Sequence, residues 1–391
     1  MKKRAPFIIL IWIVTDLYFF QGVKTLISLN FILWGYWAID LVLGAVVLYF
    51  VLMRKSDQNP KYVPRLMALM LLSLVPKLCA LPVLLVEDIS RVFRLFPKRE
   101  VWVSGLALIT AAIPFFSLLY GMIGGRHHYK VHRLTLRFKD LPNAFDGFTV
   151  TQLSDIHSGS FSSKKGVEKG IALVNKQNSD LLVFTGDLVN SHASEMDPWI
   201  ASFAKLKAPF GKFSILGNHD YGDYGKWENK ADKAANLNRL KEIHREIGFK
   251  LLENAFVNIY KDGQSMALIG VENWGKGRFH KYGSLSKATA AIPDQEFKIL
   301  LSHDPSHWEA KVLEYSKHIH LMLAGHTHGM QFGIELFGWQ WSPVKYIYPQ
   351  WAGLYEKNGK YLYVNRGFGF LGFNGRLGIW PEITVITFKK A

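Results

Sequence analysis

Apolar residues are concentrated in the first third of the chain, in four stretches separated by short polar segments. Each stretch runs for about 20 residues, the length that an α-helix needs to cross the hydrocarbon core of a bilayer. No small-residue cleavage pattern follows the first stretch, so we interpret it as a retained span rather than a cleaved leader. The pattern predicts an all-α bundle of four transmembrane helices within residues 1–125, over residues 6–24, 31–53, 66–86 and 102–123.

Lys and Arg are distributed unequally between the two ends of these helices. The side with more positive charge is expected to be cytoplasmic, and the rest of the chain follows the fourth helix on that side. We therefore expect a multi-pass protein of the cell membrane whose C-terminal part is cytoplasmic. Twelve basic residues lie on the predicted cytoplasmic side and five on the other: Lys2, Lys3, Arg4, Arg54, Lys55, Lys61, Arg65, Arg126, Lys130, Arg133, Arg137 and Lys139 against Lys24, Arg91, Arg94, Lys98 and Arg99.

Three ionisable residues, Asp16, Asp40 and Lys77, fall inside the apolar stretches. Charges in hydrocarbon are costly and are usually paired or functional. A polar path or a headgroup contact is one interpretation. We favour the other, an ion pair between Lys77 and Asp16 or Asp40 that holds the helices together, because nothing else in the spans suggests a transport route.

From about residue 133, short apolar runs alternate with helical stretches near 164–178, 196–207, 229–247 and 306–316. This alternation is typical of a layered α/β domain. We expect a linker and first strand over 126–144 and the α/β domain over 145–391. The predicted strands are Phe148–Leu153, Leu181–Thr185, Phe213–Leu216, Ala267–Val271, Phe297–Leu301, His320–Leu323, Tyr361–Val364 and Ile383–Phe388.

Polar side chains follow five of these strands directly. The carboxyl edge of an open α/β sheet is where ligands bind, so we expect these side chains to meet there. A single Asp-x-His or Gly-Asp carries little information, but five such motifs in order, each after a predicted strand, are improbable by chance. The residues are Asp155 and His157, Asp187, Asn218 and His219 with Asp220, His303 with Asp304, and His326 and His328.

These residue types indicate a metal site. Carboxylates and imidazoles without thiolates suit Mn²⁺, Fe²⁺ or Zn²⁺, and the single cysteine, Cys79, excludes a cysteine-based site or an intramolecular disulfide. In extended chain, residues i and i+2 point the same way, which would let Asp155 and His157 reach one metal together. The same argument places His326 and His328 at one site. Glycines at 186, 217, 325 and 329 would permit sharp turns and close backbone approach.

The formal net charge of +16 raises the question of a nucleic-acid partner. Much of the excess flanks the apolar stretches, where Lys and Arg set orientation and meet anionic headgroups. No basic run interleaved with aromatic residues stands out. We therefore expect the lipid bilayer, and not nucleic acid, as the main partner.

The ordered motifs Asp-x-His, Gly-Asp, Gly-Asn-His-Asp, a separate His and Gly-His-x-His resemble those of the calcineurin-like metallophosphoesterase superfamily. The resemblance covers about residues 145–391 and is strongest to its prokaryotic membrane-associated branch, where Gly-His-Thr-His-Gly-Gly is usual. Met330 replaces the last glycine here, so the local backbone geometry is expected to differ from that of the usual motif. The implied fold is a four-layer αββα sandwich, with two sheets packed face to face between helices.

The resemblance also implies roles for the site residues. Asp155, His157 and His328 would hold a first divalent metal, and Asn218, His303 and His326 a second. Asp187 would bridge the two metals, and His219 would be the catalytic histidine. Two metals clamp an in-line phosphoryl displacement by a bridging hydroxide, and His219 would protonate the leaving oxygen. Asp304 and Asp220 would orient His303 and His219. A phosphate contact by Arg366 is less expected than a structural role.

Aromatic residues crowd the segment Phe332–Tyr355 after the last metal motif. Because Trp and Tyr beside a bilayer prefer the headgroup layer, we expect a lipid-linked phosphodiester or pyrophosphate as the substrate, with Trp339, Trp341 and Trp351 touching acyl chains. Alternatives are a soluble-substrate phosphatase, a nuclease, a non-catalytic binding module, and a transporter with a regulatory domain. The intact ligand set argues against a binding module, and the few intramembrane charges argue against a transporter.

Overall fold

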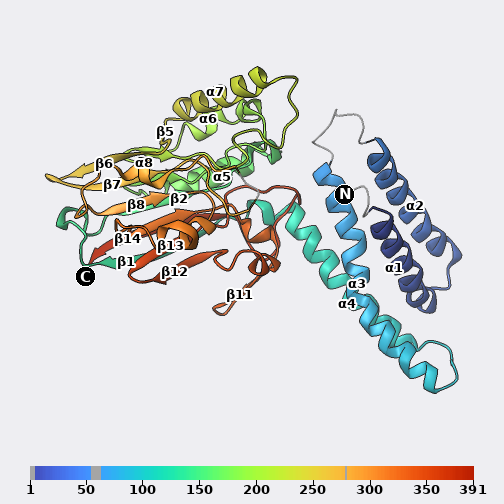
Figure 1. Cartoon of the computed structure of the whole chain (residues 1–391). Helices are drawn as coiled ribbons and strands as arrows, with labels where there is room; N and C mark the ends of the chain where they lie inside the picture. Colours follow the sequence, from blue (N-terminus) through green and yellow to red (C-terminus); the bar gives the residue numbers. More distant parts are fainter. Residues whose placement is uncertain (1–4, 54–62, 278–279) are drawn as a thin grey trace. The chain divides into compact units, whose positions relative to one another are not determined.

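The computed structural model describes residues 5–53, 63–277 and 280–391. The chain divides into two compact units, residues 1–123 with 372–375 and residues 124–371 with 376–391. The first is helical and the second contains the sheets (Figure 1).

The described residues of the helical unit form four helices: α1 (Ala5–Leu26), α2 (Asn30–Met53), α3 (Val63–Phe93) and α4 (Val101–Ile123). In the described residues, three segments are long and apolar enough to cross a membrane, Ile9–Leu26, Leu66–Phe93 and Val101–His127, and Asn30–Val46 is a shorter apolar helix. These helices coincide with the four predicted stretches, and α3 runs further than the predicted end at residue 86. Of the charges used to predict orientation, Lys2, Lys3, Arg4, Arg54, Lys55 and Lys61 lie outside the described residues.

The ionisable residues inside these helices are paired, as predicted. Lys77 of α3 contacts the Asp16 carboxylate of α1, and its Nζ lies 2.9 Å from Oδ1 of Asp40 on α2. Tyr36 donates to Oδ1 of Asp16 at 3.2 Å, and Ser73 lies within 3.2 Å of the Lys77 ammonium. One lysine therefore links three helices, which offsets the cost of placing each charge in an apolar bundle.

Two six-stranded sheets form the second unit, in the orders β1-β14-β2-β3-β4-β5 and β12-β13-β9-β8-β7-β6, with a separate hairpin β10-β11. Strands β2 to β5 are parallel to one another, and β7, β8, β9 and β13 are also parallel. The strands are β1 (Lys130–Phe138), β2 (Thr149–Leu153), β3 (Leu181–Phe184), β4 (Lys212–Ser214), β5 (Lys250–Leu251), β6 (Ala255–Lys261), β7 (Gln264–Gly270), β8 (Lys298–Leu301), β9 (Leu321–Ala324), β10 (Ile334–Leu336), β11 (Trp339–Trp341), β12 (Gly353–Lys357), β13 (Lys360–Val364) and β14 (Glu382–Lys390).

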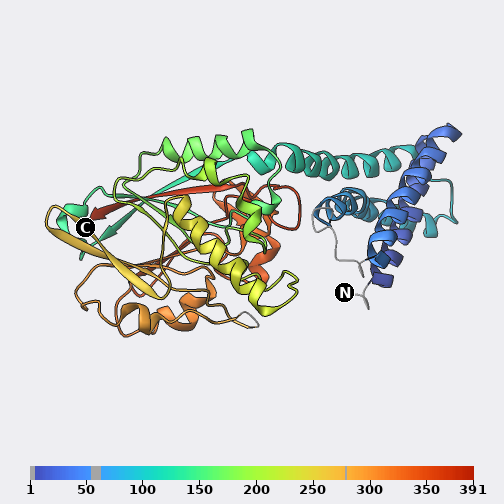
Figure 2. The same cartoon turned by 90° about the horizontal axis from the view of Figure 1, so that it is seen from above.

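The sheets pack face to face through a buried apolar layer to which both contribute, including Val150 and Val183 from one sheet and Leu268 and Ile299 from the other. The outer face of the first sheet is covered by α5 (Lys164–Asn175), α6 (Ile200–Phe203) and α7 (Lys230–Glu246). The outer face of the second is covered by α8 (Leu285–Thr289) and the helical turn Trp308–Val312. Figure 2 shows α5 and the orange helical segments on opposite sides of the strands. This is the four-layer αββα sandwich that the family resemblance implied.

Candidate functional site

The predicted ligands follow the strands as the sequence indicated. Asp155 follows β2, Asp187 follows β3, His303 follows β8 and His326 follows β9. Asn218 and His219 lie four and five residues beyond β4. Since β2 to β4 are parallel, as are β8 and β9, each set of ligands emerges at the carboxyl edge of its sheet.

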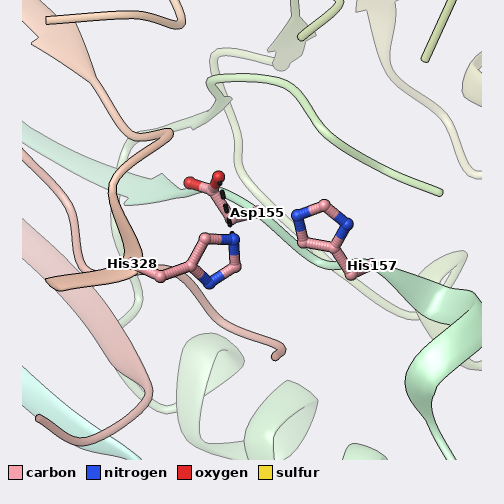
Figure 3. Close-up of side chains that lie close together, drawn as sticks. All are labelled: Asp155, His157 and His328. Carbon is pink, nitrogen blue, oxygen red and sulfur yellow. Dashed lines mark ion pairs between the residues drawn. The ribbon is translucent and has the colours of Figure 1, made fainter. Parts of the chain in front are cut away.

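Asp155, His157 and His328 form a first group whose ligand atoms lie within 4.8 Å of one another (Figure 3). Nε2 of His328 lies 3.3 Å from Oδ1 of Asp155. Nδ1 of His157 donates to the side-chain oxygen of Asn190 at 3.1 Å, which leaves Nε2 as the nitrogen with a free lone pair. Asp155 and His157 are completely buried.

Asp187, His303 and His326 form a second group. Nδ1 of His303 donates to the Thr185 carbonyl at 2.7 Å, so its Nε2 faces the group. Oδ1 of Asn218 lies 3.1 Å from that Nε2 and 2.9 Å from Nδ1 of His326. The amide of Asn218 is fixed by its other end, where Nδ2 donates to the Tyr224 hydroxyl at 3.0 Å. An amide oxygen, a carboxylate and two imidazole nitrogens thus converge.

Buried acceptor atoms at this site lack the donors that burial normally requires. Among the described residues, Nε2 of His157 and Nε2 of His328 have no hydrogen-bond partner. An unsatisfied buried polar group costs about 1–3 kcal/mol. Burial lowers the pKa of His157 to about 3, and it raises the pKa of Asp155 to about 6. A divalent cation would satisfy both nitrogens and neutralise the carboxylate, so the residues present fit a metal.

Asp187 has contacts to both groups. Its Oδ2 lies 3.2 Å from Nε2 of His303. Burial alone would lower the pKa of His303, but the nearby Asp187 carboxylate outweighs burial and raises this pKa to about 10. Its other oxygen, Oδ1, accepts from the backbone N–H of His219 at 2.9 Å. The carboxylate is therefore held by one oxygen while the second faces the ligand groups.

The backbone at these positions is left-handed and not extended. Asp155, His157, Asp187, His326 and His328 all have positive φ, between 47° and 72°. The sequence argument assumed an extended backbone, in which residues i and i+2 point the same way. That assumption was wrong at these positions. Asp155 and His157 still belong to one ligand group, but both adopt the left-handed conformation. His326 and His328, which the same argument placed at one site, belong to different groups. Such conformations cost about 1–3 kcal/mol each and cluster at functional sites.

Two glycines permit close approach, as predicted. A Cβ on Gly325 would lie 1.9 Å from Oγ of Ser154 and 2.2 Å from Oδ2 of Asp155. A Cβ on Gly217 would lie 2.2 Å from Oδ1 of Asp187. Any side chain at either position would displace a carboxylate of the site.

His219 lies beside both groups without joining either. Its Nδ1 donates to the backbone carbonyl of Asn190 at 2.8 Å, so the proton that can be exchanged is the one on Nε2. The ring of Tyr224 covers it at a centroid distance of 4.4 Å, and the ring of His157 is 4.9 Å away at 85°.

The two neighbouring aspartates have other partners than expected. Asp220 does not orient His219; its carboxylate accepts from the backbone N–H groups of Asp187, Leu188 and Gly217 at 2.8–2.9 Å and so shapes the loops that carry ligands. Asp304 does not orient His303, because that ring donates to a backbone carbonyl. The Asp304 carboxylate instead caps Ser306 N–H at 2.8 Å and approaches Tyr348.

Arg366 has the structural role that the sequence favoured. It is 1% exposed, and its guanidinium donates to Glu382 at 2.7 Å and to Glu335 of the β10-β11 hairpin at 2.6 Å. The expectation that Trp351 touches acyl chains was wrong. Trp351 is buried in a cluster with Val344 and Ile379, and its indole ring lies against Gly329. Its side chain is therefore not available to contact lipid.

Sequence reasoning missed four residues around the ligands: Asn190, Tyr224, Tyr348 and Arg376. Asn190 follows Asp187 by three residues and contacts both His157 and His219, so its position in Gly-Asp-Leu-Val-Asn was a usable signal. Arg376 is completely buried and lies 3.2 Å from Nδ1 of His328. Neither it nor Tyr348 has a local pattern that relates it to the site.

Comparison with known proteins identifies the class. A family model described as calcineurin-like phosphoesterase matches residues 148–330, and one described as a probable calcineurin-like phosphoesterase transmembrane domain matches residues 3–126. The chain belongs to the calcineurin-like phosphoesterase family, whose members are metal-dependent phosphoester hydrolases, and its N-terminal helices match the transmembrane domain found in such proteins.

Individual relatives match about two thirds or more of this chain. The chain is 31% identical over 271 residues to an uncharacterized metallophosphoesterase of Bacillus subtilis, YkuE, covering 68% of this chain and 87% of that one. It is 26% identical over 295 residues to a transmembrane protein with metallophosphoesterase domain from Danio rerio, covering 73% and 62%. It is 28% identical over 262 residues to the phosphodiesterase YaeI of Escherichia coli, covering 65% and 86%.

Proposed function

We propose that this protein hydrolyses a lipid-linked phosphodiester or pyrophosphate with two divalent cations, Mn²⁺, Fe²⁺ or Zn²⁺. Asp155, His157 and His328 hold the first cation, and Asn218, His303 and His326 hold the second. Asp187 bridges them, and His219 is the catalytic histidine. The observation that carries the proposal is that two groups of ligand atoms meet at one carboxylate, Oδ2 of Asp187.

When bound, a pair of divalent cations supplies Lewis-acid charge and activates water for in-line attack on phosphorus. The chain's own residues do the remaining work. His219, anchored through Nδ1, delivers a proton from Nε2 to the leaving oxygen. Tyr224 covers the His219 ring and fixes the Asn218 amide, so that the catalytic imidazole and a ligand share one support. Asp220 holds the Asp187 and Gly217 backbone in place.

The β10-β11 hairpin supports a lipid-linked substrate. It begins six residues after His328 and projects from the catalytic unit (Figure 1). Phe337 at its tip is 98% exposed, and Leu336 and Trp339 are each 57% exposed. Its one acidic residue, Glu335, is turned inward to Arg366. An exposed apolar hairpin without surface acid is costly in water and suits the headgroup and upper acyl region of a bilayer.

A double variant of the hairpin tests the substrate class. Phe337→Ser with Trp339→Ser removes exposed apolar surface and leaves every proposed ligand intact. We expect hydrolysis of a phosphatidyl or nucleotide-linked lipid in mixed micelles to fall at least about tenfold, while hydrolysis of a small chromogenic phosphodiester stays at the wild-type rate. Tyr260→Ser, which removes an aromatic residue 68% exposed on β6, is the matched control. Equal rates of wild type and variant on both substrates would refute a lipid-linked substrate.

We further propose that residues 145–391 are the catalytic domain, joined to the anchor of residues 1–125 by a linker and first strand over 126–144, and that this domain is cytoplasmic in the cell membrane. The bias of Lys and Arg toward that side supports the orientation. Protease added to sealed right-side-out vesicles should leave the catalytic domain intact, and its digestion there would reverse the topology.

A further inference from the structure

Tyr348 has a polar contact that the proposed mechanism does not use. It lies between the β10-β11 hairpin and β12, and its hydroxyl is 2.8 Å from Nε2 of His326. The two rings meet nearly edge to face, with centroids 5.3 Å apart at 72°. On its other side, the hydroxyl lies 3.4 Å from Oδ2 of Asp304. The same Asp304 oxygen lies 3.6 Å from Nε2 of His326, so Asp304, Tyr348 and His326 form a polar cluster in which the shortest contact is the one from Tyr348 to the proposed ligand.

The opposite nitrogen of His326 faces the second ligand group. Its Nδ1 lies 2.9 Å from Oδ1 of Asn218 and 3.3 Å from Nε2 of His303. With the proposed second cation bound, these atoms would all turn lone pairs toward it, so Nδ1 of His326 would offer its lone pair there. A neutral imidazole that does so carries its proton on Nε2. That proton is donated to the Tyr348 hydroxyl, whose own proton points toward the Asp304 carboxylate.

We propose that Tyr348 is a positioning residue for the second metal, selecting the Nε2–H tautomer of His326 and fixing the ring plane. The inference rests on the proposed dinuclear site. Tyr348 packs against a buried cluster of Val344, Trp351, Ala352 and Ile379, which holds the phenol in place. Partners of this kind orient metal-ligating histidines and raise their basicity.

The first ligand group has different supports, which makes the inference specific. His157 is oriented by Asn190, and His328 lies beside the buried guanidinium of Arg376. Among the described residues, the hydroxyl of Tyr348 bonds to His326 and Asp304 and not to Asp155, His157 or His328. Loss of its hydroxyl should therefore weaken one metal site and leave the other unchanged.

The experiment compares Tyr348→Phe with Tyr346→Phe in the full-length protein in detergent. Both variants remove one hydroxyl from the same segment, but Tyr346 is 75% exposed and no described ligand contacts it. The metal-free proteins are titrated with Mn²⁺, and free Mn²⁺ is followed by its electron paramagnetic resonance signal. Thermal unfolding of each metal-free protein reports on the fold.

We expect two Mn²⁺ equivalents for wild type and Tyr346→Phe. In Tyr348→Phe the weaker equivalent should bind about 10- to 100-fold less tightly, with the other equivalent and the unfolding temperature unchanged. Two wild-type affinities in Tyr348→Phe would overturn the inference alone. Equal weakening of both equivalents, with a lower unfolding temperature, would also overturn it and assign Tyr348 a general packing role. A wild-type protein that binds no second Mn²⁺ would refute the dinuclear proposal itself.

Discussion

Oδ2 of Asp187 lies 3.5 Å from Nε2 of His157, although the two residues belong to different ligand groups. The same oxygen is 3.2 Å from Nε2 of His303. Through this one atom Asp187 contacts an imidazole ring of each ligand group. A single carboxylate oxygen therefore connects the two halves of the site, which makes Asp187 the most informative residue to change.

Asp187→Asn replaces that anionic oxygen with a neutral amide of the same shape. We expect both Mn²⁺ equivalents to bind more weakly and hydrolysis of any phosphoester to fall by more than about 100-fold. Loss of a residue that only hydrogen-bonds to a metal ligand costs up to about 100-fold, and loss of a ligand should cost more. Metal titration and steady-state rates measure the two effects. Asp197→Asn, at a carboxylate 58% exposed, is the control and should behave as wild type. Full activity in Asp187→Asn would contradict the bridging role.

His219→Gln should separate proton donation from metal binding. The variant removes the Nε2 proton but no proposed ligand, so both Mn²⁺ equivalents should bind as in wild type. We expect kcat to fall about 10²- to 10⁴-fold for an alkyl phosphodiester, whose alkoxide leaving group needs a proton. The loss should be much smaller for a p-nitrophenyl ester. A loss of the same size for both leaving groups would argue against His219 as the acid, and His318→Gln serves as the unaltered reference.

Met330 stands where the motif that this segment resembles ends in glycine, and it has a φ of +54°. A left-handed non-glycine residue destabilises the folded state by about 1–3 kcal/mol. Glycine removes this strain, but its larger conformational entropy in the unfolded state cancels part of the gain in stability. We expect Met330→Gly to stabilise the protein by about 1 kcal/mol, measured as a higher unfolding temperature. Met330→Ala keeps the strained backbone and should give no gain. A lower unfolding temperature in the glycine variant would show that the 51% exposed methionine side chain stabilises the fold.

The Arg366–Glu382 ion pair predicts an acid-sensitive stability. Burial by itself would raise the pKa of Glu382, but Arg366 outweighs it and the pKa falls from 4.5 to about 2. Because the folded pKa is the lower one, the pair stabilises the fold above pH 4.5, and that contribution is lost as the pH falls from about 4.5 to about 2. It amounts to about 3 kcal/mol.

Glu382→Gln should therefore unfold at a lower temperature than wild type at pH 7, and the difference should shrink as the pH approaches 3. Tryptophan fluorescence during heating at several pH values measures it. Glu228→Gln, at an exposed glutamate, is the matched control. A difference between variant and wild type that is constant from pH 7 to pH 3 would contradict the lowered pKa of Glu382.

The sequence predicted most of the fold because both halves have clear periodicity. Apolar runs of bilayer length became α1 to α4, and the central strands of both sheets lie within a few residues of their predicted bounds. It missed β5, β6, β12 and the β10-β11 hairpin, because these strands are very short, alternate weakly or turn their apolar residues outward. Edge strands carry little burial signal, so periodicity alone cannot find them.

The ligands were recoverable from sequence because each follows a buried strand, but their supports were not. Tyr348 and Arg376 reach the site from segments 20 and 48 residues after His328, and only tertiary packing relates them to it. The positive φ at His157 and His326 was also not predictable, since only a few per cent of non-glycine residues adopt it, although histidine is enriched among them. Strained positions of this kind depend on surrounding contacts that the sequence does not display.

The position of β14 in its sheet has a consequence for biosynthesis. It pairs with β1 on one side and with β2 on the other, yet it follows every other strand in the sequence. During translation β1 and β2 must wait, unpaired along those edges, until residues 382–390 leave the ribosome, whereas the apolar helices have already emerged. The nascent protein would thus be committed to its membrane before it is able to turn over substrate.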